Sequence, residues 1–328
     1  MIQALFIDQN GTVNTQLQPS EFQLALEKTG GLLWVDFEGP PGEYEERILQ
    51  NVFQFHPLAV EDALKGTHIP KVDDWDIYIY VALQAVYFEP TNGGQLITQE
   101  LDVFLGKNYL VTYHNQAIHA VTRVWEACLR GERHLREGAD HLLYRLADEV
   151  IVDYMPVVEA MDDVIDQAED EIFARPTPDT LARIFTLKRA VLHLRRIIGP
   201  QREVLNKLAR DDFAVIDTKA KIYFRDVYDH LVRLHDLSES IRDLVSGALD
   251  TYLSVINNRM NEVMKTLTII TTLFMPITFI SGFFGMNYFQ ARQPYTAWTE
   301  GHVFILTLLL MVVTPATMFW WMRRRGWM

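Results

Sequence analysis

Two long uncharged stretches near the C-terminal end dominate the hydrophobic pattern of the chain. Residues 266–291 and residues 303–322 contain no Asp, Glu, Lys or Arg. A bilayer core of about 30 Å is crossed by about 20 helical residues, and helices in soluble cores rarely stay uncharged for so long. The pattern therefore predicts two membrane spans, at 266–287 and 303–322, joined by a short external loop at 288–302.

The first 115 residues follow a different pattern, with short segments rich in β-branched and aromatic side chains. Such segments are typical of strands, and turn-forming sequences such as GPPG (39–42) and EPTNGGQ (89–95) separate them. The last two segments resemble a hairpin. We expect a mixed α/β domain over 1–115, with strands at 2–7, 32–37, 77–88, 97–106 and 109–114.

Longer helical patterns follow this domain. Apolar residues recur at helical spacing over 139–173, with acidic residues between them, and a second helix follows the turn signal PTPD. These patterns predict a helical region at 116–216 and a stalk helix at 217–265. No convincing breaker separates the stalk from the first span. If 217–287 is one helix, it has about 70 residues and a length of roughly 105 Å.

One face of this long helix is polar, at the positions where a coiled-coil seam is apolar. Alternating steps of three and four residues select Asp250, Ser254, Asn257, Asn261, Met264, Thr268, Thr271, Met275, Thr278 and Gly282. Polar groups inside a membrane must face other polar groups or water. Since one helix cannot enclose a channel, the seam predicts several copies in closed cyclic symmetry, with the first span lining a pore.

Two other interpretations of this seam remain open. Membrane threonines can bond back to their own helix, in which case the stripe means little. The chain could also be a membrane-anchored sensor or scaffold, although a mere anchor would be apolar there. As a pore, the seam offers hydroxyls, thioethers and amides without charge, which suits a cation that keeps most of its water. Met264, Leu267 and Met275 could form apolar constrictions that gate by dewetting.

Charge and single residues narrow the function further. The formal net charge is -13, yet from Thr266 onward the only acid is Glu300, so the preceding body is acidic. An acidic body argues against binding to nucleic acid.

Cys128 is the only cysteine, which fits a reducing compartment. Neither a nucleophile elbow nor a phosphate loop is present, so we do not expect an enzyme.

The flanks of the two spans predict their orientation. Lys265 precedes the first span, and the aromatic and basic sequence WWMRRRGW follows the second. Basic flanks favour the cytosolic side. The acidic body, both termini and a basic tail at 323–328 are then cytosolic.

Several segments in order give the chain a family resemblance. HPLAVEDAL (56–64), PKVDDWDIYIYV (70–81), LDVFLGKNYLVTYH (101–114), YFRDVYDHL (223–231) and NEVMKTLTIITTLFMPITFISGFFGMN (261–287) resemble the CorA family of divalent-cation channels. The resemblance implies a funnel-shaped homopentamer in the cell (inner) membrane. Its α+β fold would comprise a cytosolic α/β domain, a long stalk helix continuous with the first span, and a second span. Its cargo would be Mg²⁺, with Co²⁺ and Ni²⁺ as further ions, entering the cytosol.

The same resemblance assigns roles to single residues. Gly285, Met286 and Asn287 would form the outer pore mouth, with Asn287 binding the hydrated ion. Asp250 would form an acidic ring at the inner end, and the pore lining would include Asn261, Met264, Leu267, Met275 and Thr278. Regulatory Mg²⁺ sites between subunits would use Glu61, Asp62, Asp148 and Asp226, and loss of Mg²⁺ from them would open the channel.

The chain also departs from the family pattern. The outer loop carries Arg292 and the single acid Glu300, where the family is often acidic, and Phe284 stands where a tyrosine is usual. These departures weaken the expectation of a strict Mg²⁺ preference. The alternative is a related zinc transporter of the ZntB type, with or without proton coupling. Against it, the seam has no His or Cys suited to Zn²⁺, and the loop lacks a Gly-Gly-Ile-Pro continuation.

Overall fold

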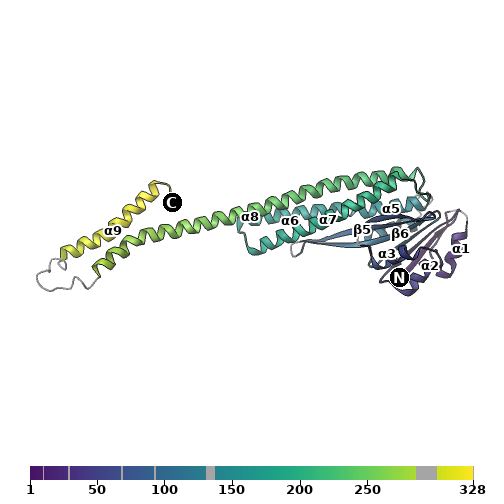
Figure 1. The fold of residues 1–328 in the computed structure, drawn as a ribbon, viewed down its shortest axis with the longest axis horizontal. Coiled ribbons are helices and arrows are strands. Elements are labelled where there is room, and N and C mark those ends of the chain that lie inside the picture. Colours follow the sequence, from purple (N-terminus) through teal and green to yellow (C-terminus); the bar gives the residue numbers. More distant parts are fainter. Residues whose placement is uncertain are drawn as a thin grey trace. The chain divides into compact units, whose positions relative to one another are not determined.

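The computed structural model describes residues 1–9, 11–28, 30–67, 69–91, 94–130, 137–285 and 301–327 (Figure 1). The chain divides into two compact units, Met1–Tyr252 and Leu253–Met328.

The first unit is built on a mixed β-sheet. Its described residues form seven strands in the order β2-β1-β3-β7-β6-β5-β4, and among their pairings only β3 with β7 is parallel. The long strands β5 and β6 pair antiparallel from Tyr78 opposite Gly106 to Glu89 opposite Gln95. The strands are β1 (Ile2–Ile7), β2 (Val13–Asn14), β3 (Leu32–Glu38), β4 (Lys71–Asp74), β5 (Tyr78–Glu89), β6 (Gln95–Gly106) and β7 (Tyr109–His114).

The sequence predicted five of these strands. Each expected segment corresponds to β1, β3, β5, β6 or β7, and the expected hairpin is confirmed by the antiparallel pairing of β6 with β7. The two strands that the pattern missed, β2 and β4, are 2 and 4 residues long. Alternation over so few residues gives little periodic signal.

Helices cover both faces of the sheet (Figure 1). One face carries the short 3-10 helix η1 (Pro19–Glu21) and α1 (Phe22–Glu27), α2 (Glu43–Asn51) and α3 (Pro57–Lys65). Their buried side chains form one core with Leu33, Val35 and Phe37 of β3. Because side chains alternate along a strand, Trp34 points to the other face, where its ring packs edge-on against Trp125.

The opposite face is covered by α4 (His119–Leu129), α5 (Ala139–Val152), α6 (Tyr154–Ala174) and α7 (Pro178–Arg210). Tyr154 anchors α6 to the sheet, since its buried hydroxyl donates to the Gln84 carbonyl at 2.7 Å. The first unit is therefore a three-layer arrangement of helices, sheet and helices.

The long helix α8 (Ala220–Phe284) has 65 residues. It corresponds to the single helix predicted over 217–287, and its described end lies just before the Gly-Met-Asn sequence. In the first unit its buried residues recur every three or four positions, from Ala220 and Phe224 to Tyr252. The helix continues through Pro276, which lacks the amide hydrogen for one helical bond.

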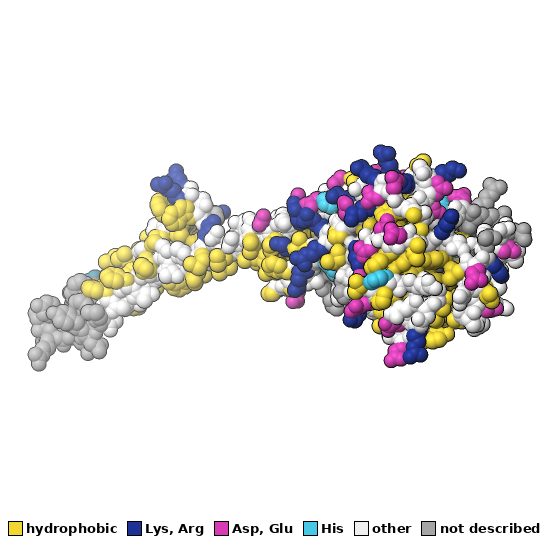
Figure 2. Space-filling model, turned by 45° about the vertical axis from the view of Figure 1, so that its right-hand side comes forward, with side chains coloured by type: hydrophobic (Ala, Val, Ile, Leu, Met, Phe, Trp, Pro, Cys, Tyr) yellow, Lys and Arg dark blue, Asp and Glu magenta, His cyan; other side chains and the backbone are white. Residues whose placement is uncertain are grey.

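The second unit contains the rest of α8 and the helix α9 (Gly301–Arg324). Both α8 and α9 hold a window that is long and apolar enough to cross a membrane, and none of either window is buried. Hydrophobic side chains are gathered on the surface of this unit (Figure 2). The expected fold of an N-terminal α/β domain, a long helix and two candidate membrane helices is confirmed.

Candidate ion pathway and regulatory carboxylates

The polar seam of α8 is exposed along its whole described length. Within the second unit, its positions from Ser254 to Gly282 are all exposed, and Asp250 is exposed near the end of the first unit. At about 100° per residue these positions share one side of the helix. The half-covered residues of the apolar stretch, among them Ile269, Leu273 and Ile280, lie roughly opposite. The described residues of this copy therefore do not cover the seam.

The seam threonines bond to their own helix, as one of the open interpretations expected. The Oγ1 atoms of Thr268, Thr271 and Thr278 donate to the carbonyls four residues earlier, at 2.8, 2.9 and 3.0 Å. A hydroxyl that donates still has lone pairs that accept hydrogen bonds. Thr317 of α9 makes the same kind of bond, to Val313 at 2.9 Å. Back-bonding is thus compatible with a pore lining and does not by itself identify one.

The predicted pore mouth begins at the end of α8. The amide of Gly285 donates to the Ser281 carbonyl at 2.9 Å, and a Cβ added at Gly285 would lie 2.9 Å from that oxygen. Any side chain there would force the backbone to shift, which explains the glycine. Met286, Asn287 and the loop up to residue 300 lie outside the described residues.

Two predicted regulatory acids, Glu61 and Asp62, are neighbours on α3. Both side chains are about half exposed, and each is already paired with a lysine. Glu61 pairs with Lys65 one helical turn away, whereas Asp62 accepts from Lys71 of β4 at 2.6 Å. Neither lysine was predicted to matter. The spacing of four residues could have identified Lys65, but Lys71 is brought in only by the fold.

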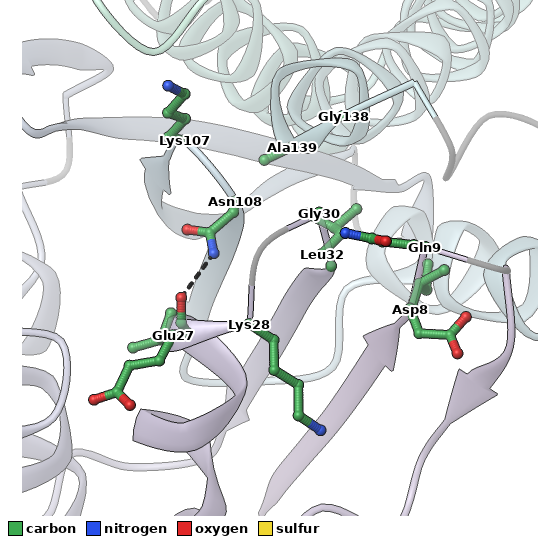
Figure 3. Close-up of a pocket in the computed structure, with 13 residues that line it drawn as sticks. Asp8, Gln9, Glu27, Lys28, Gly30, Leu32, Lys107, Asn108, Gly138 and Ala139 are labelled. Carbon is green, nitrogen blue, oxygen red and sulfur yellow. Dashed lines mark hydrogen bonds between the residues drawn. The ribbon is translucent and has the colours of Figure 1, made fainter.

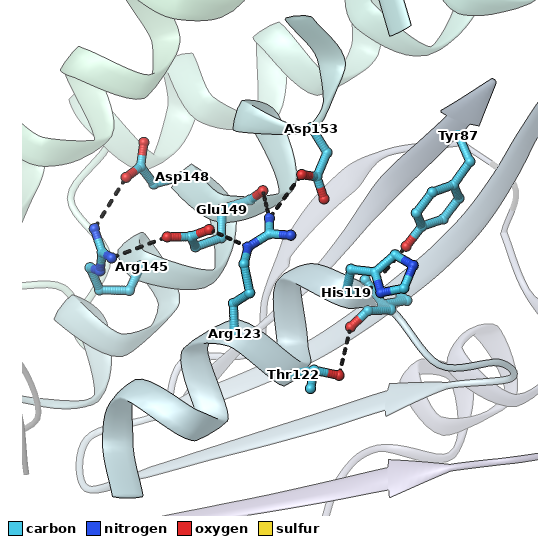
Figure 4. A network of polar contacts seen from close by, with 9 residues as sticks. Tyr87, His119, Thr122, Arg123, Arg145, Asp148, Glu149 and Asp153 are labelled. Atoms are coloured by element: carbon cyan, nitrogen blue, oxygen red, sulfur yellow. Dashed lines mark hydrogen bonds and ion pairs between the residues drawn. The ribbon is translucent and has the colours of Figure 1, made fainter. Parts of the chain in front are cut away.

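The other two acids, Asp148 of α5 and Asp226 of α8, act on each other electrostatically. Burial raises the pKa of Asp148, Arg145 opposes that rise, and the charges of Glu149 and Asp226 add to it. Arg145 lies between Asp148 and Glu149, at 3.3 and 3.2 Å (Figure 4). Asp226 itself is exposed. This pair therefore offers a partly buried and an exposed carboxyl group.

The structure does not bring all four acids together. Among the described residues, no group of three or more His, Cys, Asp or Glu side chains could hold a metal ion. Glu61 and Asp62 form one pair and Asp148 and Asp226 another. A metal site that uses acids of both pairs would therefore need a second copy of the chain.

A separate cavity of about 600 Å³ opens beside the start of α5 (Figure 3). Its lining includes Lys28 and Lys107 as well as Asp8 and Glu27, so it does not concentrate negative charge. Asn108 lies at its wall and donates to the Leu26 carbonyl at 3.0 Å, which ties the turn after β6 to α1. This cavity does not correspond to any predicted cation site.

The architecture is that of a two-span membrane protein with a large α/β domain before its long helix. The model of the family described as CorA-like Mg²⁺ transporter protein matches residues 29–324. The chain belongs to this family.

Two curated relatives and one solved structure are similar to this chain. The chain is 36% identical over 300 residues to the cobalt/magnesium transport protein CorA of Thermotoga maritima, covering 90% of this chain and 83% of that one. It is 24% identical over 276 residues to the zinc transport protein ZntB of Yersinia pestis, covering 83% and 81%. The complete structure of the CorA magnesium transporter from Methanocaldococcus jannaschii has the same fold, with a TM-score of 0.83 at 24% identity, covering 99% and 98%.

Proposed function

We propose that this chain assembles as a homopentamer whose α8 helices line a pore that conducts Mg²⁺ into the cell, with Co²⁺ and Ni²⁺ as further cargo. The observation that carries the proposal is the exposed polar seam on a helix whose apolar window is also unburied. In a bilayer a continuous polar seam is most stable where it faces polar groups or water. Several copies around one axis meet this need, and the cobalt/magnesium transport relative supports the choice of ion.

The seam conducts by accepting hydrogen bonds from the waters of the ion. Its threonine oxygens and the amides of Asn257 and Asn261 are neutral, so they do not strip water from Mg²⁺, which dehydrates reluctantly. Exposed Met264, Leu267 and Met275 form the apolar rings that close the pore by dewetting. Asn287 holds the hydrated ion at the outer mouth.

Intracellular Mg²⁺ regulates the pore through the two carboxylate pairs. Mg²⁺ bridges Glu61 and Asp62 of one copy to Asp226 and Asp148 of its neighbour, and the bridged assembly stays closed. The separation of the two pairs within one chain supports this arrangement. Without Mg²⁺ the facing carboxylates repel and the subunits loosen. The regulatory ions thereby bias an open–closed equilibrium at a distance from the pore, which is allosteric control.

The chain lies in the cell membrane with both termini in the cytosol. Lys265 and Arg323–Arg325 flank the spans, and the guanidinium groups of Arg324 and Arg325 lie over the rings of Trp320 and Trp321. Basic and aromatic residues are typical of the cytosolic interface.

The pore lining is tested with a matched pair of variants. Thr278→Val removes one hydroxyl from the seam, and Thr317→Val removes the same kind of back-bonded hydroxyl from α9. We expect Thr278→Val to lower Mg²⁺ flux into proteoliposomes about fivefold, since a lost hydrogen-bond acceptor is worth about 1 kcal/mol. Thr317→Val should leave the flux unchanged. Equal flux through both variants, with intact oligomers, would refute the seam as the pathway.

The pore mouth and the cargo are tested in the same liposomes. Asn287→Ala should abolish Mg²⁺ flux while the oligomer remains assembled. Flux of Mg²⁺, Co²⁺, Ni²⁺ and Zn²⁺ is compared with and without a pH gradient. Uptake of Zn²⁺ that requires the gradient, together with absent Mg²⁺ uptake, would instead favour a proton-coupled zinc transporter.

The regulatory acids are tested by limited proteolysis of the oligomer. Asp226→Ala and Asp62→Lys should each reduce the protection that Mg²⁺ gives to the wild type. If the variants and the wild type are cleaved equally with and without Mg²⁺, the proposed regulation is wrong.

A further inference from the structure

Asp62 of the proposed regulatory site already holds a cation. The ammonium of Lys71 lies 2.6 Å from Oδ2 of Asp62 and 2.7 Å from Oδ2 of Asp73. It also lies 5.1 Å from the centre of the Tyr80 ring. A lysine ammonium is a point charge with three donors, and a ring face attracts it further. Lys71 therefore contacts three groups at once.

The fold holds this ammonium in place. Lys71 and Asp73 are two residues apart on β4, so their side chains share one face of the strand. The pairing of β4 with β5 sets Asp73 opposite Tyr80, whose buried hydroxyl donates to Asp102 at 2.6 Å. The side chain of Lys71 is 31% exposed, whereas that of Lys65 beside Glu61 is 75% exposed. The two lysines thus differ, since the register of β4 and the aromatic ring fix only Lys71.

We propose that Lys71 is a resident competitor of Mg²⁺ for Asp62, and that it sets the Mg²⁺ concentration at which the regulatory site fills. This inference rests on the regulation proposed above. A divalent ion must take Asp62 from an ammonium that cannot diffuse away. When Mg²⁺ binds Asp62, the ammonium of Lys71 still has Asp73 as an ion-pair partner, so its charge remains paired. The exchange is therefore easily reversed, which weakens the site and allows it to respond to the free ion concentration.

Competition by Lys71 predicts that two substitutions shift the Mg²⁺ midpoint of protection in opposite directions. Lys71→Gln removes the competing charge, and the Mg²⁺ concentration that gives half-maximal protection from proteolysis should fall about two- to fivefold, the range expected for a partly exposed ion pair. Asp73→Asn leaves Asp62 as the only carboxylate for Lys71, so the midpoint should rise. Lys71→Arg keeps the charge and should stay within about twofold of the wild type.

The experiment uses the full chain in detergent, titrated with MgCl₂ in the presence of a protease. Arg47→Gln is the matched control, because it removes one positive charge from the exposed pair of Arg47 with Glu43 and should not move the midpoint. The double variant Lys71→Gln/Asp73→Asn completes a cycle. If Asp73 acts through Lys71, its substitution should shift the midpoint less in the double variant than in the wild type. Thermal unfolding without Mg²⁺ verifies that each variant is folded.

The outcomes separate this inference from the proposal on which it rests. A wild type protected by Mg²⁺, with a Lys71→Gln midpoint that matches Arg47→Gln, would overturn the competitor role alone. A full-sized Asp73→Asn effect in the absence of Lys71 would do the same. A wild type that Mg²⁺ does not protect would overturn the proposed regulation and this inference with it.

Discussion

A buried acid in the central sheet is expected to limit the stability of the α/β domain at neutral pH. Asp102 of β6 is 2% exposed, and its Oδ1 accepts from the Tyr80 hydroxyl at 2.6 Å. Burial raises the pKa of Asp102 well above its ordinary value of 3.8, the charge of Glu100 adds to the rise, and the Tyr80 hydrogen bond opposes it. We predict that Asp102→Asn stabilises the protein at pH 7.

The magnitude follows from proton uptake. In the unfolded chain the carboxyl is ionised above about pH 4, and each pH unit by which burial raises the folded-state pKa costs about 1.36 kcal/mol of stability at a pH above both pKa values. Since the folded-state pKa is the raised one, stability is complete below the unfolded pKa and is lost as pH rises toward the folded value. Asparagine has the same shape, is always neutral and still accepts from Tyr80. We therefore expect a gain on the order of 1 kcal/mol or more at pH 7.

The assay is chemical unfolding of the detergent-solubilised chain between pH 5 and pH 8, followed by tryptophan fluorescence. Wild-type stability should fall across this range, and Asp102→Asn should fall less. Asp229→Asn, at an exposed position on α8, serves as the control and should follow the wild type. If Asp102→Asn is less stable than the wild type at pH 7, or has the same pH slope, the reasoning is wrong.

Three further changes probe the domain and the helix end. Tyr154→Phe should cost about 1–2 kcal/mol in chemical unfolding, since its buried hydroxyl donates to Gln84 at 2.7 Å, and a loss below 0.3 kcal/mol would contradict this. Arg123→Leu should cost under about 1 kcal/mol, and less in high salt, because this ion-paired side chain is 42% exposed; a salt-independent loss would be inconsistent with that (Figure 4). Gly285→Ala should reduce Mg²⁺ flux in liposomes, because its Cβ would meet the Ser281 carbonyl, and wild-type flux would show that the end of α8 tolerates the shift.

The long elements could be predicted because their patterns are local. The strands β5 and β6 have 12 residues each, and the continuous helix α8 needed only the absence of a convincing breaker between the stalk and the first span. The short strand β4 was not predicted because four residues show little periodicity. That omission had a consequence for the site, because β4 carries Lys71 and Asp73.

The candidate sites divide in the same way. A seam along one helix follows from helical geometry alone, so its positions could be listed from the sequence; all of them are exposed, as are many apolar residues beside them. The contact between Asp62 and Lys71 depends on how α3 lies against the sheet edge, which a chain-local pattern does not encode. The raised pKa of Asp102 likewise depends on its burial within the folded domain. Such contacts join elements that are distant in the sequence, and packing of the whole core sets how these elements lie relative to one another, so a local pattern does not predict the contacts.

The seam threonines do not by themselves require water, so they cannot alone distinguish a pore lining from a surface that faces lipid. Each seam threonine already donates to its own helix, so only its acceptor lone pairs would remain unpaired in lipid, a modest cost. Asn257 and Asn261 lie on the same line of the helix in the stalk before the predicted span, and both are exposed, so water can satisfy their amide groups there. Because the polar line runs without interruption from these stalk amides into the threonines of the span, it favours a water-filled path over an isolated set of back-bonded hydroxyls. Thr278 and Thr317 make the same bond to their own helix, but only Thr278 lies on the polar seam of α8. A difference in Mg²⁺ flux between Thr278→Val and Thr317→Val would therefore be due to the position on the seam and not to the loss of a back-bonded hydroxyl.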